Sequence, residues 1–356
     1  MDKIYIIHEN DDWMPPFREA FQSEGLPFEE WHMAWVSLDL EDTPPEGVFY
    51  SRMSASAHTR GHRSIPEYTA GVLCWLEHHG RRVVNGSRAL DLELSKLRQY
   101  QALKASAIRV PHTRAARDVE ELRALSLSVP EPFITKHNRG GKGLGVQLFQ
   151  DAAALSGSLD EGRLEAPVDG IFLLQEYIRS EVPFITRCEF IGGEFVYAVR
   201  VNTADGFELC PADACQIDDT YCPAGSGEPN RFEIVVDFNE PLLLKRYGSF
   251  LRDNDIEVAG IEFITDLHGR QWTYDVNTNT NYNRAAEVSA GASAPRTLAR
   301  FLGMLIRLST AYHWRAGEKR QQSTGVKWNQ AKDKVGTSAS QHDRSGYSPR
   351  VKALHP

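Results

Sequence analysis

A glycine-rich stretch near the middle of the chain could hold an anion. Residues 134–149 read ITKHNRGGKGLGVQLF, with four glycines between two short apolar segments. Backbone N–H groups in such a loop can close around a phosphate. The spacing matches neither G-x-x-x-x-G-K-[ST] nor the G-x-G-x-x-G that opens a helix, because the residues after the glycines alternate like a strand. We therefore expect a β-hairpin whose tip can fold over a ligand, although an ordinary glycine hairpin without a ligand has the same pattern.

A second hairpin that could do chemistry is predicted at 260–283, GIEFITDLHGRQWTYDVNTNTNYN. Two strand-like segments flank residues typical of a turn. A four-residue loop after Asp266 would pair this residue with Gln271. Counting back along both strands, Glu262 then faces Asp275 directly.

Two carboxylates that face each other across a hairpin repel unless a cation neutralises them. Gly260 would lie opposite Asn277, so two acids and one amide oxygen share a patch, with directly opposed Cβ atoms about 5 Å apart. Mg²⁺ binds such oxygens and keeps positions open for phosphate oxygens. Gly260 would leave room for the cation and a nucleotide. A polar sheet face with hydrated acids is the alternative, but the asparagine run after the hairpin is not typical of a strand and favours a site.

The bulk composition excludes several classes of protein. The chain has 356 residues, of which 41% are hydrophobic and 25% charged, and its net charge is −8. This is typical of a globular protein of about two or three domains and does not favour a nucleic-acid surface. No apolar run approaches the roughly 20 residues of a membrane helix, and the N-terminus lacks the apolar core of a signal peptide. Five cysteines without a C-x-x-C pair favour a reduced, cytoplasmic protein, while a metal site among Cys210, Cys215 and Cys222 stays open.

The elements expected around these two hairpins predict three α/β subdomains and a tail. Strands are expected at 3–8, 31–40 and 47–51, and helices at 15–25, 65–79, 91–104 and 294–312. The three strands and the first two helices indicate a small domain with a partly parallel sheet. The expected divisions are an N-terminal domain at 1–95, a central subdomain with the glycine loop at 96–180, a subdomain with the carboxylates at 181–316, and a disordered polar tail at 317–356.

Six motifs, in this order, resemble the ATP-grasp superfamily, and within it the glutathione-synthetase-like branch with the glutamate ligases that modify ribosomal protein. They are VFYSRMSASAHTRGH, RRVVNGSRALDLELSKLRQYQAL, RVPHT, ITKHNRGGKGLGV, LLQEYIR and GIEF…YDVNTN. Each motif alone is weak, but their order and spacing over roughly residues 48–285 are specific. The resemblance implies an α/β ATP-grasp fold, in which a small N-terminal domain precedes two sheet-containing subdomains that sandwich ATP.

The resemblance also implies a role for each matching residue. The catalytic cations would be Arg187 and Arg200. The metal ligands, for two Mg²⁺ ions, would be Glu262, Asp275 and Asn277. The residues that bind the nucleotide would be Lys96, Lys136, Gly140, Gly141, Lys142, Gly143, Gly145, Gln175, Glu176, Tyr177, Ile178 and Glu181. The residues that bind the substrate would be Arg52, Asn281 and Arg284.

The chain departs from the family pattern where ribose and substrate would bind. Ile185 stands where relatives commonly carry an acid for the ribose hydroxyls, and Glu181 could take that role. The two metal carboxylates have exchanged lengths, since Glu262 replaces the usual Asp and Asp275 the usual Glu. The basic substrate loop of the relatives is replaced by NTADGFELCPADACQI, so the resemblance does not imply that this protein adds glutamate.

The implied reaction is ATP-dependent ligation of a carboxylate and an amine. The carboxylate attacks the γ-phosphate, giving an acyl phosphate and ADP, and the amine then displaces phosphate to form an amide. The expected partners are a small acid and a small amine, one of them an amino acid; a peptide substrate and a homo-oligomer stay open, and no nucleic acid or membrane is expected. Two other classes also stay open: a phosphotransferase, which needs no amine, and a non-catalytic nucleotide-binding module.

Two histidines in the first motif were weighed as metal ligands. His58 and His62 stand four residues apart, beside Arg60 and Arg63. Zinc ligands at this spacing need a helix, which the glycine in SASAHTRGHRS disfavours. A loop that binds an anionic carboxylate substrate is therefore favoured over a metal site.

Overall fold

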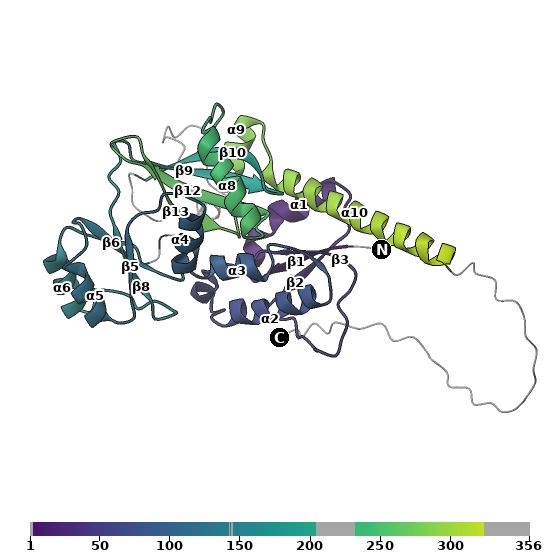
Figure 1. Cartoon of the computed structure of the whole chain (residues 1–356), viewed down its shortest axis with the longest axis horizontal. Helices are drawn as coiled ribbons and strands as arrows, with labels where there is room; N and C mark the ends of the chain where they lie inside the picture. Colours follow the sequence, from purple (N-terminus) through teal and green to yellow (C-terminus); the bar gives the residue numbers. More distant parts are fainter. Residues whose placement is uncertain (1–2, 142, 144, 204–231, 324–356) are drawn as a thin grey trace, which may run out of the picture.

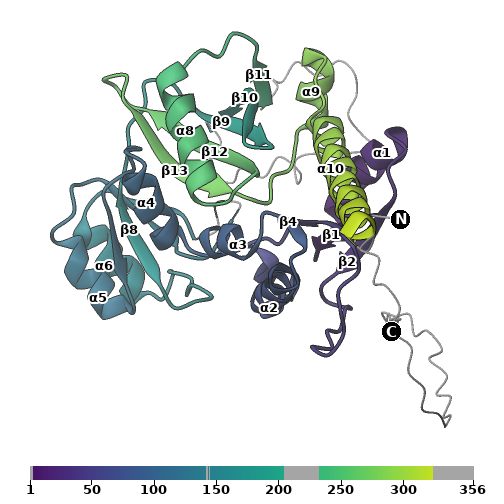
Figure 2. The same ribbon diagram turned by 45° about the vertical axis from the view of Figure 1, so that its right-hand side comes forward.

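The computed structural model describes residues 3–141, 143, 145–203 and 232–323, which form three sheets with helices against their faces (Figures 1 and 2). The first sheet is parallel and the other two are antiparallel. No described helix combines the length and the apolar composition that crossing a lipid bilayer would require.

The N-terminal sheet has the strand order β2-β1-β3-β4. Its strands are β1 (Lys3–His8), β2 (Phe28–His32), β3 (Gly47–Ser51) and β4 (Arg82–Val84). Successive side chains of β1 point to opposite faces, so Ile4 packs with α1 (Pro15–Ser23) and α10 (Ala294–Ser323), whereas Tyr5 packs with α2 (Ile65–His78). The predicted strands at 3–8 and 47–51 are confirmed.

The strand expected at 31–40 is wrong beyond His32. β2 begins at Phe28 because it pairs in parallel with β1, from Ile4 opposite Phe28 to His8 opposite His32. Beyond that pair the backbone turns, and the carbonyl of His32 accepts from the N–H groups of Trp35 and Val36. Apolar residues in this segment therefore belong to a turn.

The helix expected at 91–104 is two helices, α3 (Ser87–Glu93) and α4 (Lys96–Ala105). Ser95 has an extended backbone and its hydroxyl accepts from the N–H of Arg98, so it is the N-cap of α4. The break places Lys96 at the first position of a helix that faces the interior.

The central sheet has the order β5-β8-β6-β7 and two helices on its outer face. Its elements are β5 (Thr113–Ala116), α5 (Val119–Ser126), β6 (Phe133–His137), β7 (Gln147–Phe149), α6 (Ala152–Asp160) and β8 (Phe172–Glu176). β6 and β7 pair antiparallel, with Phe133 opposite Phe149. The predicted hairpin around the glycine loop is confirmed.

The third sheet has the order β11-β10-β9-β12-β13. Its strands are β9 (Phe184–Ile191), β10 (Glu194–Asn202), β11 (Phe232–Val235), β12 (Val258–Thr265) and β13 (Gln271–Asn277). One face packs against α4 and α8 (Pro241–Asp253), and the other contributes to the core that α1 and α10 share with the N-terminal sheet. α10 thus returns the chain to its first domain, as Figure 2 shows.

The β12–β13 hairpin has the predicted pairing of Glu262 with Asp275, but its turn and its register differ from the prediction. Thr265, not Asp266, pairs with Gln271, so the turn is one residue longer than expected. A bulge at Tyr274 then shifts the register by one, and Glu262 again lies opposite Asp275. α10 also continues to Ser323, past residue 317, where the disordered tail was predicted to begin; residues 324–356 lie outside the described part of the chain.

Candidate active site

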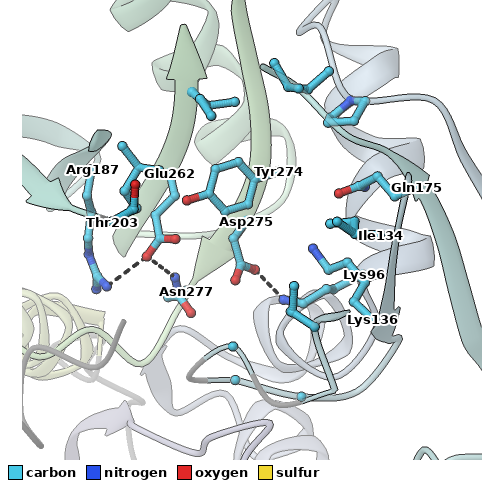
Figure 3. A pocket seen from close by; sticks show the side chains of 18 of the residues that line it. Lys96, Ile134, Lys136, Gln175, Arg187, Thr203, Glu262, Tyr274, Asp275 and Asn277 are labelled. Carbon is cyan, nitrogen blue, oxygen red and sulfur yellow. Dashed lines mark hydrogen bonds and ion pairs between the residues drawn. The ribbon is translucent and has the colours of Figure 1, made fainter. Parts of the chain in front are cut away.

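A cavity of about 490 Å³ lies between the two antiparallel sheets. Figure 3 shows Glu262, Tyr274 and Asp275 on one wall, facing Lys96 and Lys136 on the other. The cavity unites both predicted hairpins, the hinge after β8 and the start of α4. Sequence reasoning predicted this convergence of the two hairpins.

The carboxylate wall consists of two rows of residues across the third sheet. In one row Asp275, Glu262 and Arg187 are successive cross-strand neighbours on β13, β12 and β9. The row beside it contains Asn277, Gly260 and Glu189. Cross-strand neighbours share a face, so these polar side chains gather on the side of the sheet that lines the cavity.

Opposite charges are paired along the first row. Arg187 Nη1 lies 3.2 Å from Glu262 Oε1, and Asn277 Nδ2 lies 3.3 Å from the same oxygen. Lys96 Nζ reaches across from α4 to Asp275 Oδ1 at 2.5 Å. Burial raises the pKa of Glu262, with Arg187 opposing the rise. Burial also acts to raise the pKa of Asp275, but the charges of Lys96 and Lys136 outweigh it and lower that pKa.

Gly260 makes room for Arg187 and not, as predicted, for a cation and a nucleotide. A Cβ at this position would lie 2.5 Å from Arg187 Nε and 2.6 Å from its Nη2. The guanidinium lies over the glycine and donates to Glu189 Oε1 at 2.6 Å and to the hydroxyl of Thr280. Although burial opposes it, the carboxylates of Glu189 and Glu262 raise the pKa of Arg187, which is therefore a permanent cation.

Lys136 faces the cavity from β6 and is held by aromatic side chains. Its Nζ donates to the Tyr100 hydroxyl at 2.8 Å and lies 5.7 Å from the centre of the Tyr274 ring. The same hydroxyl accepts from Gln175 Nε2 at 3.1 Å and donates to the carbonyl of Tyr274 at 2.8 Å. Burial lowers the pKa of Lys136, with Asp275 and Glu262 opposing the fall.

The glycine loop contributes some of its predicted residues to the cavity. Gly140, Gly141 and Gly143 line it, whereas Gly145 is not among the described lining residues. Gly145 has φ +71° and its missing Cβ would meet the His137 ring at 2.4 Å, so this glycine serves the packing of the hairpin. The Lys142 prediction lies outside the described residues.

Two side chains at the base of the glycine loop bind residues of other elements. Asn138 Oδ1 accepts from the N–H of Leu97 at 2.8 Å, which ties the loop to the start of α4. Arg139 Nη1 lies 2.5 Å from Glu67 Oε1 on α2. The glycine hairpin therefore contacts the N-terminal domain as well as its own sheet.

The hinge, residues 175–178 at the end of β8, is predicted to bind the nucleotide, and all four of its residues line the cavity, as does Glu181. Glu176 Oε1 accepts from the backbone N–H of His112 at 2.8 Å, and the N–H of Tyr177 donates to the carbonyl of Pro132 at 3.2 Å. These two hydrogen bonds hold the backbone of the hinge in place. They also engage one carboxylate oxygen of Glu176, a residue predicted to bind the nucleotide.

Three predicted arginines are not among the described residues that line the cavity. Arg200 lies opposite Thr186 on β9, so alternation along the strand puts it on the sheet face away from Arg187; it is exposed, with its guanidinium over the Phe184 ring. Arg284 is the exposed first residue of α9 (Arg284–Ala290) and pairs with Glu19 at 3.4 Å.

The third of these arginines, Arg52, is buried in the N-terminal core. Its guanidinium lies 3.8 Å from the centre of the Phe17 ring, and Nη2 donates to Asn281 Oδ1 at 2.7 Å and to the Thr280 carbonyl at 3.1 Å. Asn281 itself lines the cavity. Arg52 thus contacts a lining residue of the cavity, Asn281, but is not itself among the described lining residues.

Sequence reasoning missed several polar residues of the site. Glu189 lies two residues after Arg187 on one strand, and this spacing was a usable signal. Glu93 is half-buried and lines the cavity, where it accepts from the N–H of Thr278 at 2.7 Å and from the N–H of Ala55 at 3.2 Å. Tyr100 was hidden inside an apolar helix pattern, and only its contact with Lys136 reveals its place.

The donor set fits a hard cation bound together with an anion. Glu262, Asp275 and Asn277 offer the oxygen ligands that Mg²⁺ prefers. Asn279 lines the cavity and is buried, yet neither polar atom of its side-chain amide has a hydrogen-bond partner among the residues that the structure describes. Burying an unpaired amide is costly, so this side chain fits a bound polar ligand.

Comparisons with known proteins agree with this geometry. Residues 94–208 match the model of the RimK-like ATP-grasp domain. A probable alpha-L-glutamate ligase of Xanthomonas euvesicatoria is 32% identical over 144 residues, which are 40% of this chain and 48% of that protein. The chain thus spans about half the length of the curated relatives it matches.

Solved structures extend the likeness to most of the chain. A RimK domain protein ATP-grasp from Sphaerobacter thermophilus superposes with a TM-score of 0.59 at 15% identity, over 84% of this chain and 98% of that one. The ATP-grasp ligase PsnB, complexed with a phosphomimetic variant of its minimal precursor, Mg and ADP, superposes with a TM-score of 0.58 at 16% identity, over 85% and 98%. The chain therefore has the ATP-grasp fold and contains a RimK-like ATP-grasp domain.

Proposed function

We propose that this protein is an ATP- and Mg²⁺-dependent ligase that joins a carboxylate to an amine and releases ADP and phosphate. The observation that carries the proposal is the row Asp275–Glu262–Arg187, facing Lys96 and Lys136 across one cavity. Phosphoryl transfer needs cations and metal ligands around the transferred group more than it needs a covalent nucleophile. This wall and its facing lysines supply that combination.

In this proposal Glu262, Asp275 and Asn277 hold two Mg²⁺ ions. Bound Mg²⁺ would neutralise the charge that develops on the phosphate oxygens. Lys96 exchanges Asp275 for a phosphate oxygen, and Lys136, which donates to the neutral hydroxyl of Tyr100, gains an anionic hydrogen-bond partner. The glycine loop covers the nucleotide, and the hinge borders the adenine.

Arg187 and Asn281 are the residues we assign to the reacting substrate. Arg187 is a buried cation in the row of metal ligands, so it can stabilise the carboxylate as this group attacks the γ-phosphate. The resulting acyl phosphate reacts with an amine: the C–N bond forms, the C–O bond to phosphate breaks, and the amine loses a proton. Asn281, held by Arg52, would orient the carboxylate or the amine.

An amino acid or a peptide is the substrate we favour. The similar curated proteins are described as probable alpha-L-glutamate ligases, and PsnB was solved in a complex with the precursor peptide PsnA2. These descriptions support an amino acid or a peptide as one of the two substrates. The segment NTADGFELCPADACQI replaces the relatives' basic substrate loop, so we do not carry over glutamate itself.

The test is ADP release from Mg²⁺-ATP with pools of amino acids and short peptides, supplied alone and in pairs, with mass spectrometry of each product. We expect turnover to need two components and to yield a condensed mass. Adding hydroxylamine in place of the amine should give a hydroxamate, because it traps an acyl phosphate. A stable phosphorylated product from one component would instead show a phosphotransferase and contradict the ligase.

Asp275→Asn is the variant that connects this activity to the site. It keeps the volume of the side chain but replaces the anionic metal ligand with a neutral amide, and it removes the negative charge that pairs with Lys96. We expect about a 10³-fold fall in kcat. Glu194→Gln, an exposed acid on β10 of the same sheet, is the matched control and should retain full activity. Equal activity of the two variants would reject the assigned site.

A further inference from the structure

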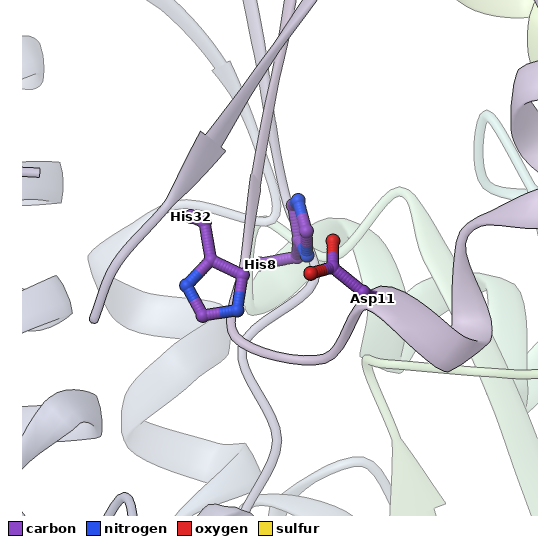
Figure 4. Close-up of side chains that lie close together, drawn as sticks. All are labelled: His8, Asp11 and His32. Atoms are coloured by element: carbon purple, nitrogen blue, oxygen red, sulfur yellow. The ribbon is translucent and has the colours of Figure 1, made fainter. Parts of the chain in front are cut away.

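A second group of possible metal ligands lies in the N-terminal domain, at the carboxyl ends of two parallel strands. His8 ends β1 and His32 ends β2, and the two are partners in the strand register. Asp11 begins η1 (Asp11–Trp13), directly after β1. One ligand atom from each of the three residues lies within 4.8 Å of the others. Figure 4 shows these side chains close together at the ends of the strands.

His8 is the residue of this group whose surroundings are incomplete. It is 2% exposed, and neither ring nitrogen makes a hydrogen bond within the described structure. The nearest charged atom is Glu30 Oε2, 3.3 Å from Nε2. A carboxylate beside one nitrogen of an imidazole fixes the tautomer and leaves the lone pair on the other nitrogen, as in many metal sites. Nδ1 of His8 is then a buried lone pair without a donor.

The charged side chains near His8 are paired with other residues and not with its Nδ1. Arg18 binds Glu30 Oε2 at 2.7 Å and Asp11 Oδ1 at 3.2 Å, so one oxygen of Asp11 is still available. Glu9 is paired elsewhere: its Oε1 lies 2.5 Å from Arg60 Nη2, and its Oε2 lies 2.8 Å from His62 Nδ1. His58 Nδ1 lies 3.1 Å from the Ala55 carbonyl oxygen, so this nitrogen, like Nδ1 of His62, is engaged with a protein oxygen.

Two imidazoles and one carboxylate are the ligand set of a first-row transition metal. Mg²⁺ prefers oxygen ligands alone, so this group differs in chemistry from the carboxylate wall. We propose that His8, Asp11 and His32 bind a divalent transition-metal ion, with Zn²⁺ as the natural probe, at the carboxyl edge of the N-terminal sheet. The three ligand atoms, which lie within 4.8 Å of one another, must move closer together to reach Zn–N bonds of about 2.0 Å.

The site is separate from the cavity between the antiparallel sheets. His8, Asp11 and His32 are not among the described residues that line that cavity. Trp13 stands between the two regions: it lines the cavity, and its ring lies 4.6 Å below the guanidinium of Arg60, which Glu9 holds. The ion can enter from the side of Asp11, whose side chain is half exposed.

The experiment is a Zn²⁺ titration of the tag-free, full-length protein after treatment with a chelator, in excess Mg²⁺ so that the carboxylate wall is occupied. We expect one equivalent of Zn²⁺ to bind, and Asp11→Asn and His32→Gln each to weaken the affinity by about tenfold or more. Asp91→Asn removes an exposed aspartate that is likewise paired with an arginine, and His79→Gln removes a histidine that likewise packs on a tryptophan. These two matched controls should bind as the wild type does.

Co²⁺ absorption of the wild-type protein identifies the ligands without any substitution. Imidazole and carboxylate ligation gives visible d–d bands but no thiolate charge-transfer band in the near ultraviolet, which separates this site from any cysteine site. A thiolate band, the absence of stoichiometric binding, or equal affinity of Asp11→Asn and Asp91→Asn would each overturn the proposal. Thermal unfolding without metal verifies that the variants fold.

Discussion

The two hairpins that border the cavity differ in how their charges are satisfied. On β12–β13, Glu262 is paired with Arg187 and Asp275 with Lys96. On β6–β7, Lys136 donates to the hydroxyl of Tyr100, and burial lowers its pKa. The carboxylate hairpin is thus neutralised before any ligand binds. The glycine hairpin presents a buried amine whose charge has only a neutral hydrogen-bond partner.

This difference indicates which wall is preformed and which one is completed by the ligand. Arg187 is fixed from several sides by Glu189, Glu262 and Thr280, so the carboxylate wall holds its geometry alone. A phosphate would give Lys136 an anionic hydrogen-bond partner in addition to the neutral hydroxyl of Tyr100, and binding would therefore stabilise the glycine hairpin more than the carboxylate hairpin. The predictions below alter one wall at a time.

Removing the central cation of the carboxylate wall should have the largest effect on stability. Arg187→Ala leaves Glu189 and Glu262 buried without their partner, which typically costs about 3–5 kcal/mol. Arg200→Ala removes an exposed arginine from the opposite face of the same sheet, and should change the free energy of unfolding by less than about 0.5 kcal/mol. Urea denaturation measures both. Similar losses for the two variants would mean that the wall does not depend on Arg187.

Crowding that arginine should have the next largest effect. Gly260→Ala places a methyl group 2.5 Å from Arg187 Nε, so overpacking should cost about 1–3 kcal/mol and displace the guanidinium. Gly71→Ala in α2 meets no atom within 4 Å and should stabilise the protein by about 0.5–1 kcal/mol. In urea denaturation, the midpoint of Gly260→Ala should therefore lie below that of the wild type, and the midpoint of Gly71→Ala above it. A neutral Gly260→Ala would show that Arg187 moves without cost.

Tyr100 bonds to both walls, so Tyr100→Phe tests whether they are coupled. The change removes the acceptor of Lys136 and the donor to the Tyr274 carbonyl. Loss of these bonds should weaken ATP binding by about 1 kcal/mol, or roughly fivefold in Kd. Tyr68→Phe, which loses a bond to the Val36 carbonyl outside the cavity, should leave the Kd unchanged. Calorimetric titration with ATP distinguishes the two, and an unchanged Kd for Tyr100→Phe would argue against coupling.

The smallest effect is expected at the base of the glycine loop, and it should depend on pH. Burial acts to raise the pKa of Glu67, but the hydrogen bond from Arg139 prevails and lowers it. A carboxyl with a lowered pKa in the folded state contributes stability above its unfolded pKa, near 4.5, and loses it as the pH falls through the folded value. The protection factors of the amides at Asn138–Gly141, which compare the exchange rate with the intrinsic rate at each pH, should therefore fall between pH 5 and pH 3 in the wild type more than in Glu67→Gln. An equal fall in both proteins would exclude this anchor.

The sequence predicted the site through pattern, and its errors have physical causes. Glu262 was placed opposite Asp275 by counting from a turn that proved one residue too short, and the bulge at Tyr274 compensated for this. Turn length and bulges depend on packing between sheets, which one sequence does not reveal. The order of the motifs was sufficient to predict the fold, because an error of one residue in a turn does not change that order.

The arginines show what strand alternation cannot decide alone. Arg187 and Arg200 lie in neighbouring strand-like segments, but only the register between β9 and β10 shows that they face opposite ways. Register is set by tertiary contacts, so from the sequence both arginines were equal candidates. Glu189 could have been found, since it shares the face of Arg187 two residues away. Arg52 matched a family motif, yet a buried position makes it a support for Asn281.

The most direct test of the account is the affinity of a non-hydrolysable ATP analogue measured as Mg²⁺ is varied, in the wild type and in Asp275→Asn. If the carboxylate wall holds the metal and the glycine hairpin holds the phosphates, added Mg²⁺ should tighten binding to the wild type. Asp275→Asn should retain weak, metal-free binding and lose most of that gain. Affinity independent of Mg²⁺ in the wild type, or an undiminished gain in Asp275→Asn, would contradict the account.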